Sequence, residues 1–97
     1  MSHQRCPATK GTIHEFLVAV DALRQGFRVY RNISGGPVDL ILTKPGLMLR
    51  VQVKTQPQRS ALRGNDVLAI VTKDGRIRYR ARTRRVARKF ENCTVLY

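Results

Sequence analysis

The chain has 97 residues, which is enough for one hydrophobic core and too few for two, so we expect a single domain over residues 1–97. Its 42% hydrophobic content excludes a disordered basic tail, and no apolar run approaches the roughly 20 residues that span a bilayer. Nineteen Lys and Arg against six Asp and Glu give a formal net charge of +13, which favours a polyanionic partner, with nucleic acid ahead of an anionic membrane.

A helix and a short strand are the first predicted elements. Residues 1–10 are expected to be a flexible basic lead-in, and helix signals begin at Thr12. Apolar residues then recur at helical spacing and form one stripe, ended by Gly26: Ile13, Phe16, Leu17, Val20 and Leu23. Alternation over 27–31 predicts a strand, and 32–37 (NISGGP) is typical of a loop.

A hairpin is predicted next. Residues 38–43 are a mainly apolar run, and Lys44-Pro45-Gly46 has the composition of a tight turn. The following strand alternates clearly. Its predicted inner face holds Leu47, Leu49, Val51 and Val53, and its outer face holds Met48, Arg50, Gln52 and Lys54.

The C-terminal half continues the sheet. Residues 55–65 are loop-like, 67–71 predict a buried central strand, and Asp74-Gly75 predicts a two-residue turn into a strand over 76–82. Thr83 can cap a short helix that reaches Phe90, and 94–97 predict a terminal strand. We therefore expect an α/β fold, with an N-terminal helix packed on a central mixed β-sheet and a short C-terminal helix.

Asp39 and the Gln52-x-Lys54 segment form the candidate site. Because the two strands of the hairpin run antiparallel, Asp39 comes close to Gln52 and Lys54. The Asp39 carboxylate, the Gln52 side-chain oxygen and the Val53 carbonyl can bind a hard cation such as Mg²⁺. Lys54 can then stabilise a phosphate or steer an attacking water. A carboxylate between Val38 and Leu40 is costly to bury unless it is paired or metal-bound.

Simpler interpretations compete at two positions of this site. Glu15 follows Thr12 by three residues, which is the spacing of a capping box, so the glutamate can serve the helix start, the catalytic site or both. Gln52 can be a solvated strand residue instead of a ligand. Lys54 is unremarkable alone and gains meaning only beside Asp39.

Arginines dominate the C-terminal third of the chain. A few of them are explained by a solvated surface, but a full strand face and one side of a helix exceed that need, and arginines favour bidentate contact with phosphate. We predict a surface that holds the nucleic-acid backbone and senses shape or charge more than base identity. It comprises Arg76, Arg78, Arg80, Arg82, Arg84, Arg85 and Arg88, extended by Arg59 and Arg63. No long basic amphipathic helix supports membrane binding.

The ordered set Glu15, Pro37-x-Asp39 and Gln52-x-Lys54 resembles the PD-(D/E)xK nuclease superfamily. Its early part is similar to archaeal-type Holliday junction resolvases, and the QxK variant is similar to a group I intron homing endonuclease of the same superfamily. The residues that carry the resolvase likeness are Lys10-Gly11-x-x-x-Glu15, Gly26-Phe27, Arg31, Ser34-Gly35 and Asp39.

The resemblance implies a restriction-endonuclease-like core in which Asp39 is the central metal ligand and Lys54 the catalytic cation. Glu15 becomes a metal or water-positioning carboxylate, Gln52 a weaker ligand, and Lys10, Arg31 and Ser34 contact DNA. The superfamily usually has an acidic residue at the position of Gln52, so weakened metal binding is expected here.

The expected function is a Mg²⁺-dependent DNA endonuclease, with Mn²⁺ as a substitute, that cuts branched or four-way DNA as a cytoplasmic homodimer. Two alternatives stay open. One is a non-catalytic nucleic-acid-binding module on a nuclease fold, with Gln52 as the mark of lost activity. The other is a small sequence-specific homing or restriction-type endonuclease.

Overall fold

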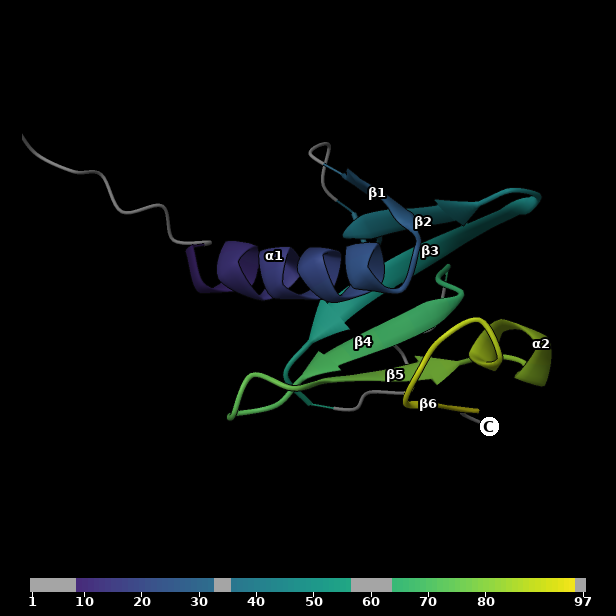
Figure 1. Cartoon of the computed structure of the whole chain (residues 1–97). Coiled ribbons are helices and arrows are strands. Elements are labelled where there is room, and N and C mark those ends of the chain that lie inside the picture. The colour runs from purple at the N-terminus through teal and green to yellow at the C-terminus, as the bar shows by residue number, and fades with distance from the viewer. Residues whose placement is uncertain (1–8, 33–35, 57–63, 96–97) are drawn as a thin grey trace, which may run out of the picture.

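One long helix and one six-stranded mixed sheet form most of the protein in the computed structural model, which describes residues 9–32, 36–56 and 64–95. Helix α1 (Thr9–Arg24) lies on one face of the sheet, and the short helix α2 (Arg84–Ala87) lies near its C-terminal strands (Figure 1). The strands are β1 (Arg28–Arg31), β2 (Leu40–Lys44), β3 (Leu47–Lys54), β4 (Val67–Val71), β5 (Ile77–Ala81) and β6 (Cys93–Val95). The predicted α/β class, with both helices and a mixed sheet, is confirmed.

The strands follow chain order across the sheet, and two of the five pairings are parallel, β3 with β4 and β5 with β6. The antiparallel pairs β2–β3 and β4–β5 are hairpins. Both turns predicted from the sequence are present, and each contains a glycine at positive φ, with 74° at Gly46 and 83° at Gly75. Other side chains rarely adopt such angles, so these two glycines fix where the hairpins reverse.

The core lies between α1 and the sheet face below it. Val18 and Ala22 of α1 are fully buried, and they join a cluster that includes Leu40, Val51 and Ala69. At one end of this core the ring of Phe90 stacks on Phe27 and Tyr79, with ring centroids 4.9 and 4.4 Å apart. The predicted alternation in the strand after the first hairpin turn is confirmed, because Leu49 and Val51 are buried while Met48 and Arg50 are exposed.

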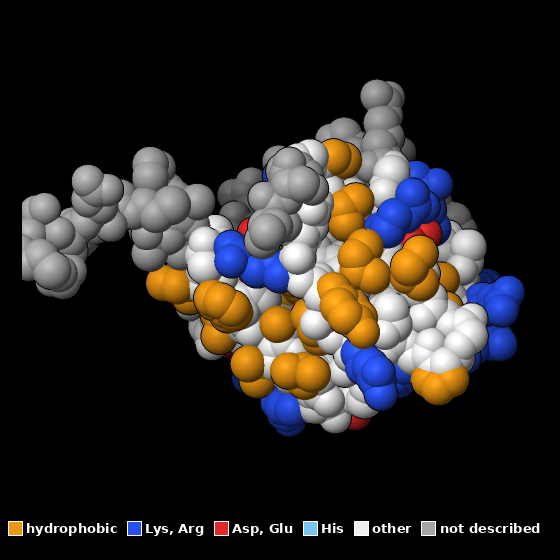
Figure 2. Space-filling view, turned by 90° about the horizontal axis from the view of Figure 1, so that it is seen from above, with side chains coloured by type: hydrophobic (Ala, Val, Ile, Leu, Met, Phe, Trp, Pro, Cys, Tyr) orange, Lys and Arg blue, Asp and Glu red, His pale blue; other side chains and the backbone are white. Residues whose placement is uncertain are grey.

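The apolar stripe of α1 does not face this core. Its five large side chains, namely Ile13, Phe16, Leu17, Val20 and Leu23, are between 39% and 57% exposed. Figure 2 shows hydrophobic side chains gathered over this part of the molecule. The helix instead contributes the smaller Val18 and Ala22 to the core, and small side chains at this position let a helix lie close to the sheet.

Several element boundaries differ from the prediction. Helix α1 begins at Thr9, inside the expected lead-in and three residues before Thr12. Strand β2 begins at Leu40 and not at Val38, because the carbonyl of Val38 accepts a hydrogen bond from the Asn32 side chain instead of joining the ladder. Strand β5 and helix α2 are shorter than expected, although Thr83 does cap α2 by accepting a 3.2 Å hydrogen bond from the Val86 amide. None of the helices described is both long and apolar enough to cross a membrane.

Candidate active site

Asp39 lies immediately before β2, at an irregular point of strand pairing. Its amide donates to the carbonyl of Val51 at 2.9 Å, although the register partner of Val51 is Leu40. Two successive residues thus oppose one, as in a β-bulge, a device that redirects side chains. The Asp39 carboxylate is turned back onto β3, where its Oδ2 atom accepts a hydrogen bond from the Val53 amide at 2.8 Å.

Two asparagines hold the backbone that leads into Asp39. Nδ2 of Asn65 donates to the carbonyl of Pro37 at 3.1 Å, and Nδ2 of Asn32 donates to the carbonyl of Val38 at 2.6 Å. The amide of Asn32 also donates to the carbonyl of Asp39 at 2.9 Å. Three successive carbonyls are therefore fixed, which limits the positions that the Asp39 side chain can take. Sequence reasoning missed both asparagines, because each looks like an ordinary loop residue until the fold brings it to this segment.

Asp66 in turn fixes the position of Asn65. Its Oδ2 atom accepts from the Arg50 amide at 2.8 Å, and the Asp66 amide donates to the Arg50 carbonyl at 2.8 Å. The Arg50 guanidinium completes the clamp as an ion pair with Asp66, 3.3 Å from Nε to Oδ2. This clamp joins β3 to the start of β4 and leaves Asn65 fully buried beside it.

The charge of Asp39 is destabilised by its surroundings. Burial raises the pKa of its carboxyl, the hydrogen bond from Val53 lowers it, the nearby Glu15 carboxylate raises it, and the Lys54 ammonium lowers it; the net pKa is above the ordinary value. Glu15 from α1 and Lys54 from the end of β3 thus both lie within electrostatic range of Asp39. The structure brings together three of the four predicted catalytic residues.

Glu15 is held by Arg31 and not by the start of its helix. Oε1 of Glu15 lies 3.0 Å from Nε of Arg31, and Nη2 of Arg31 donates to Oγ1 of Thr12 at 3.3 Å. Because α1 begins at Thr9, Thr12 lies within the helix and the capping-box interpretation of Glu15 is wrong. The Arg31 guanidinium, predicted to contact DNA, is therefore engaged with the site itself and also lies 5.5 Å from the centroid of the Phe16 ring.

Gln52 and Lys54 lie on the sheet face opposite α1. Val51 and Val53 point into the core, and successive strand residues alternate between faces. Among the residues that the structure describes, Gln52 makes no hydrogen bond to Asp39, so its role as a ligand gains no support from direct contact.

The strand register connects these two residues to arginines. Gln52 pairs with Leu68, which pairs with Arg80; Lys54 pairs with Ile70, which pairs with Arg78. Residues paired across neighbouring strands share a face, and strands are about 4.8 Å apart, so each arginine is two strands from a site residue. The basic row of β5 is therefore on the same sheet face as Gln52 and Lys54, separated from them by Leu68 and Ile70, which are buried.

The other predicted DNA contacts that the structure describes lie near β5 and α2, and α2 packs through Val86 and Ala87 on the α1 side of the sheet. Arg76 precedes β5 and pairs with Asp74 at 3.2 Å, and Arg82 follows β5. Arg84, Arg85 and Arg88 are exposed in and just after α2. Ser34, Arg59 and Arg63 lie outside the described residues, as does the side chain of Lys10.

The oxygen atoms near Asp39 are suited to weak binding of a hard cation. Within the described ranges no hydrogen bond reaches Oδ1 of Asp39, and no group of three or more His, Cys, Asp or Glu gathers there or elsewhere. Two carboxylates are available, Asp39 and Glu15, and a cation would relieve the unfavourable charge of Asp39. With water completing the coordination shell, this set of oxygen ligands fits Mg²⁺ better than a softer metal.

Comparison of the chain with protein-family models, with curated proteins and with solved structures gives no match. The case for a function therefore depends on the residues themselves.

Proposed function

We propose that the chain is a Mg²⁺-dependent DNA endonuclease with a restriction-endonuclease-like core. The observation that carries the proposal is Asp39, a carboxylate held against β3 at a bulge, with a raised pKa and with Glu15 and Lys54 in electrostatic range. A poorly neutralised carboxylate beside a lysine and a second carboxylate is typical of a catalytic site. The helix on a mixed sheet is consistent with the proposed core.

In this proposal Asp39 would be the main metal ligand, and the Val53 carbonyl and Gln52 would complete the protein's share. Mg²⁺, or Mn²⁺ in its place, would supply positive charge at the scissile phosphate and lower the pKa of the attacking water. Oδ2 of Asp39 is kept in place by Val53, so Oδ1 is the atom available to the cation.

Glu15 and Lys54 act on the reacting groups. The Lys54 ammonium stabilises the negative charge that grows on the phosphate as water attacks phosphorus. Arg31 holds Oε1 of Glu15, which leaves Oε2 to orient the water and take its proton. The bond from phosphorus to the leaving oxygen then breaks, so the products are a phosphate-ended and a hydroxyl-ended strand.

DNA is proposed to lie across the face that carries Gln52 and Lys54. Arg78 and Arg80 share that face, and their guanidinium groups suit phosphate contacts that carry no sequence information. Because these contacts are to phosphates and not to bases, we propose that the chain prefers branched DNA, recognised by its shape, and that it acts in the cytoplasm. A non-catalytic binding module is the second candidate, favoured by the neutral Gln52 at the position where the superfamily usually has an acidic residue.

A single cleavage assay separates the candidates. The native chain, Asp39→Asn and Lys54→Ala are each incubated with supercoiled plasmid, linear duplex and a four-way junction, with and without Mg²⁺. We expect Mg²⁺-dependent cutting of the junction by the native chain, at least about a hundredfold slower in either variant. Binding without cleavage in Mg²⁺ or Mn²⁺ would refute the enzyme and support the binding module. Cleavage of linear duplex at one sequence would support a sequence-specific nuclease instead.

A further inference from the structure

The exposed stripe of α1 has the spacing of a helix-pairing seam. Ile13, Phe16, Val20 and Leu23 are separated by three, four and three residues, and Leu17 widens the seam on one side. This is the apolar repeat with which helices pack against each other. Isolated exposed hydrophobic side chains need no explanation, but a contiguous row along one helix marks a contact surface.

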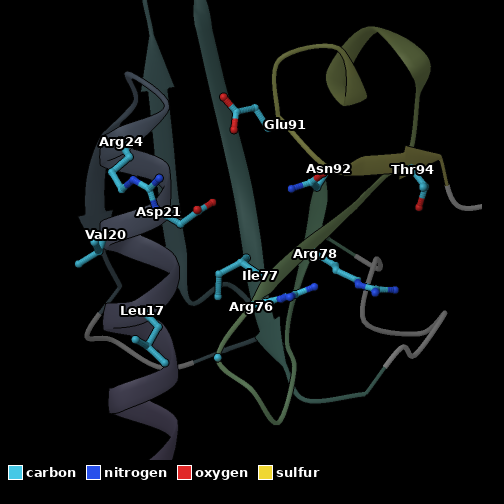
Figure 3. Close-up of a pocket in the computed structure, with 11 residues that line it drawn as sticks. Leu17, Val20, Asp21, Arg24, Arg76, Ile77, Arg78, Glu91, Asn92 and Thr94 are labelled. Atoms are coloured by element: carbon cyan, nitrogen blue, oxygen red, sulfur yellow. The ribbon is translucent and has the colours of Figure 1, made fainter.

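A groove of about 750 Å³ runs beside this seam. It lies between α1 and the β5–β6 region, and Leu17 and Val20 line it together with Ile77 (Figure 3). The seam and the groove wall therefore form one surface, with apolar side chains in the middle and charged side chains around them. Protein interfaces have the same arrangement of an apolar centre and a polar rim.

Charged residues of both signs surround this surface. The chain has six Asp and Glu, and Asp21 and Glu91 line the groove while Asp74 precedes Gly75, which also lines it. Arg24, Arg76 and Arg78 line it as well, so both signs of charge occur there. A copy related by a two-fold axis presents the same set in reverse order, which allows pairing of opposite charges. The proposed binding surface for a polyanion is the opposite sheet face, which carries the arginines of β5.

We propose that this surface is the interface between two copies of the chain, packed seam against seam. The helix has 16 residues and is about 24 Å long, which limits the seam to a narrow strip. A standard interface buries about 800 Å² per partner, so the groove walls must contribute to a stable dimer. The interface borders the proposed site, because Phe16 lies under Arg31, the partner of Glu15.

Sedimentation equilibrium on nucleic-acid-free protein tests this interface. We expect a monomer–dimer equilibrium that shifts toward dimer as salt rises from about 0.1 to about 0.5 M, because salt screens the repulsion between two strongly basic chains. Assembly through ion pairs or residual DNA would weaken with salt. A protein that stays monomeric at about 100 μM at both salt concentrations would overturn the proposal.

Two variants locate the contact. Val20→Glu should raise the dimer dissociation constant at least tenfold, and Leu23→Ser, which removes apolar area without adding charge, should do the same if the first variant folds poorly. Met48→Glu is the matched control, since Met48 is 67% exposed on β3, on the sheet face away from α1. Val20→Glu and Leu23→Ser that fold and still dimerise like the native chain would exclude this seam. The assay contains no DNA or metal, so its failure leaves the nuclease proposal untouched.

Discussion

The Val53 amide donates to Oδ2 of Asp39 across 2.8 Å, at the place where β2 and β3 stop pairing regularly. One hydrogen bond thus joins the backbone between Gln52 and Lys54 to the only acidic residue of the hairpin. It ties a local irregularity of the sheet to the charge on which the proposed chemistry depends.

Asp39→Asn should preserve the fold while abolishing cleavage. The Asn oxygen can still accept from Val53, and the variant removes a carboxylate whose pKa is raised by burial and by Glu15. The folded state of the native chain binds more protons than the unfolded state between pH 3.8 and the raised pKa, so its stability falls as pH rises through that window. At pH 7 the variant should therefore be as stable as the native chain or better, by at most ~0.5 kcal/mol given solvent screening.

Urea unfolding at pH 3 and pH 7 measures this difference. Below the ordinary pKa of 3.8 the native carboxyl is protonated and the advantage of the variant should vanish. A loss of more than about 1 kcal/mol at pH 7 would mean that the carboxylate is needed for folding.

Gln52→Glu should reduce the metal requirement. An added negative charge near Asp39 strengthens binding of a divalent cation, and we expect the Mg²⁺ midpoint for cleavage to fall on the order of tenfold. Gln52→Leu keeps a similar size without an oxygen and serves as the control. An unchanged Mg²⁺ midpoint in the Glu variant would remove Gln52 from the ligand set.

Arg80 should contribute more to DNA binding than Arg76. Arg80 is in the same cross-strand row as Gln52, whereas Arg76 pairs with Asp74 beside the turn. Fluorescence anisotropy over a salt series should give Arg80→Ala a several-fold weaker affinity and a salt slope smaller by about 1. Equal slopes for both alanine variants and the native chain would contradict the proposed DNA face.

Thr12→Ala should hardly change stability, because Thr12 is inside α1 and not at its start. The expected loss in unfolding free energy is below about 0.5 kcal/mol, whereas removal of a true N-cap typically costs ~1 kcal/mol. Thr83, whose Oγ1 does cap α2, provides the comparison as Thr83→Ala. A larger cost at Thr12 than at Thr83 would restore the capping role.

Asn65→Ala should destabilise the protein by about 1–3 kcal/mol, because it removes a fully buried side chain whose amide donates to the carbonyl of Pro37. Cleavage should fall further than the loss of folded protein explains, since the segment before Asp39 loses an anchor. Gln56→Ala, at an exposed position, is the control. Normal turnover per folded molecule would limit Asn65 to stability.

Local patterns predicted the elements well where they depend on neighbours in sequence. The hairpin turns need Gly46 and Gly75 at positive φ, and strict alternation from Leu47 to Lys54 leaves one choice of face. The start of α1 and the direction of its apolar face were harder to predict. The spacing of apolar residues from Ile13 to Leu23 shows that they share one face of the helix, but not what that face packs against. Asn32 and Asn65 carry no signal in sequence, since their partners are carbonyls of a distant segment.

By itself the sequence determined the strand order of each hairpin, the sheet's inner face and the pairing of Asp39 with the Gln52–Lys54 segment, because these follow from short-range geometry. Tertiary structure alone decided that Glu15 binds Arg31, that Asp39 is held by a bulge, and that arginines of β5 share a face with Gln52 and Lys54. Those contacts join residues that are distant along the chain, and their positions are set by packing and register together.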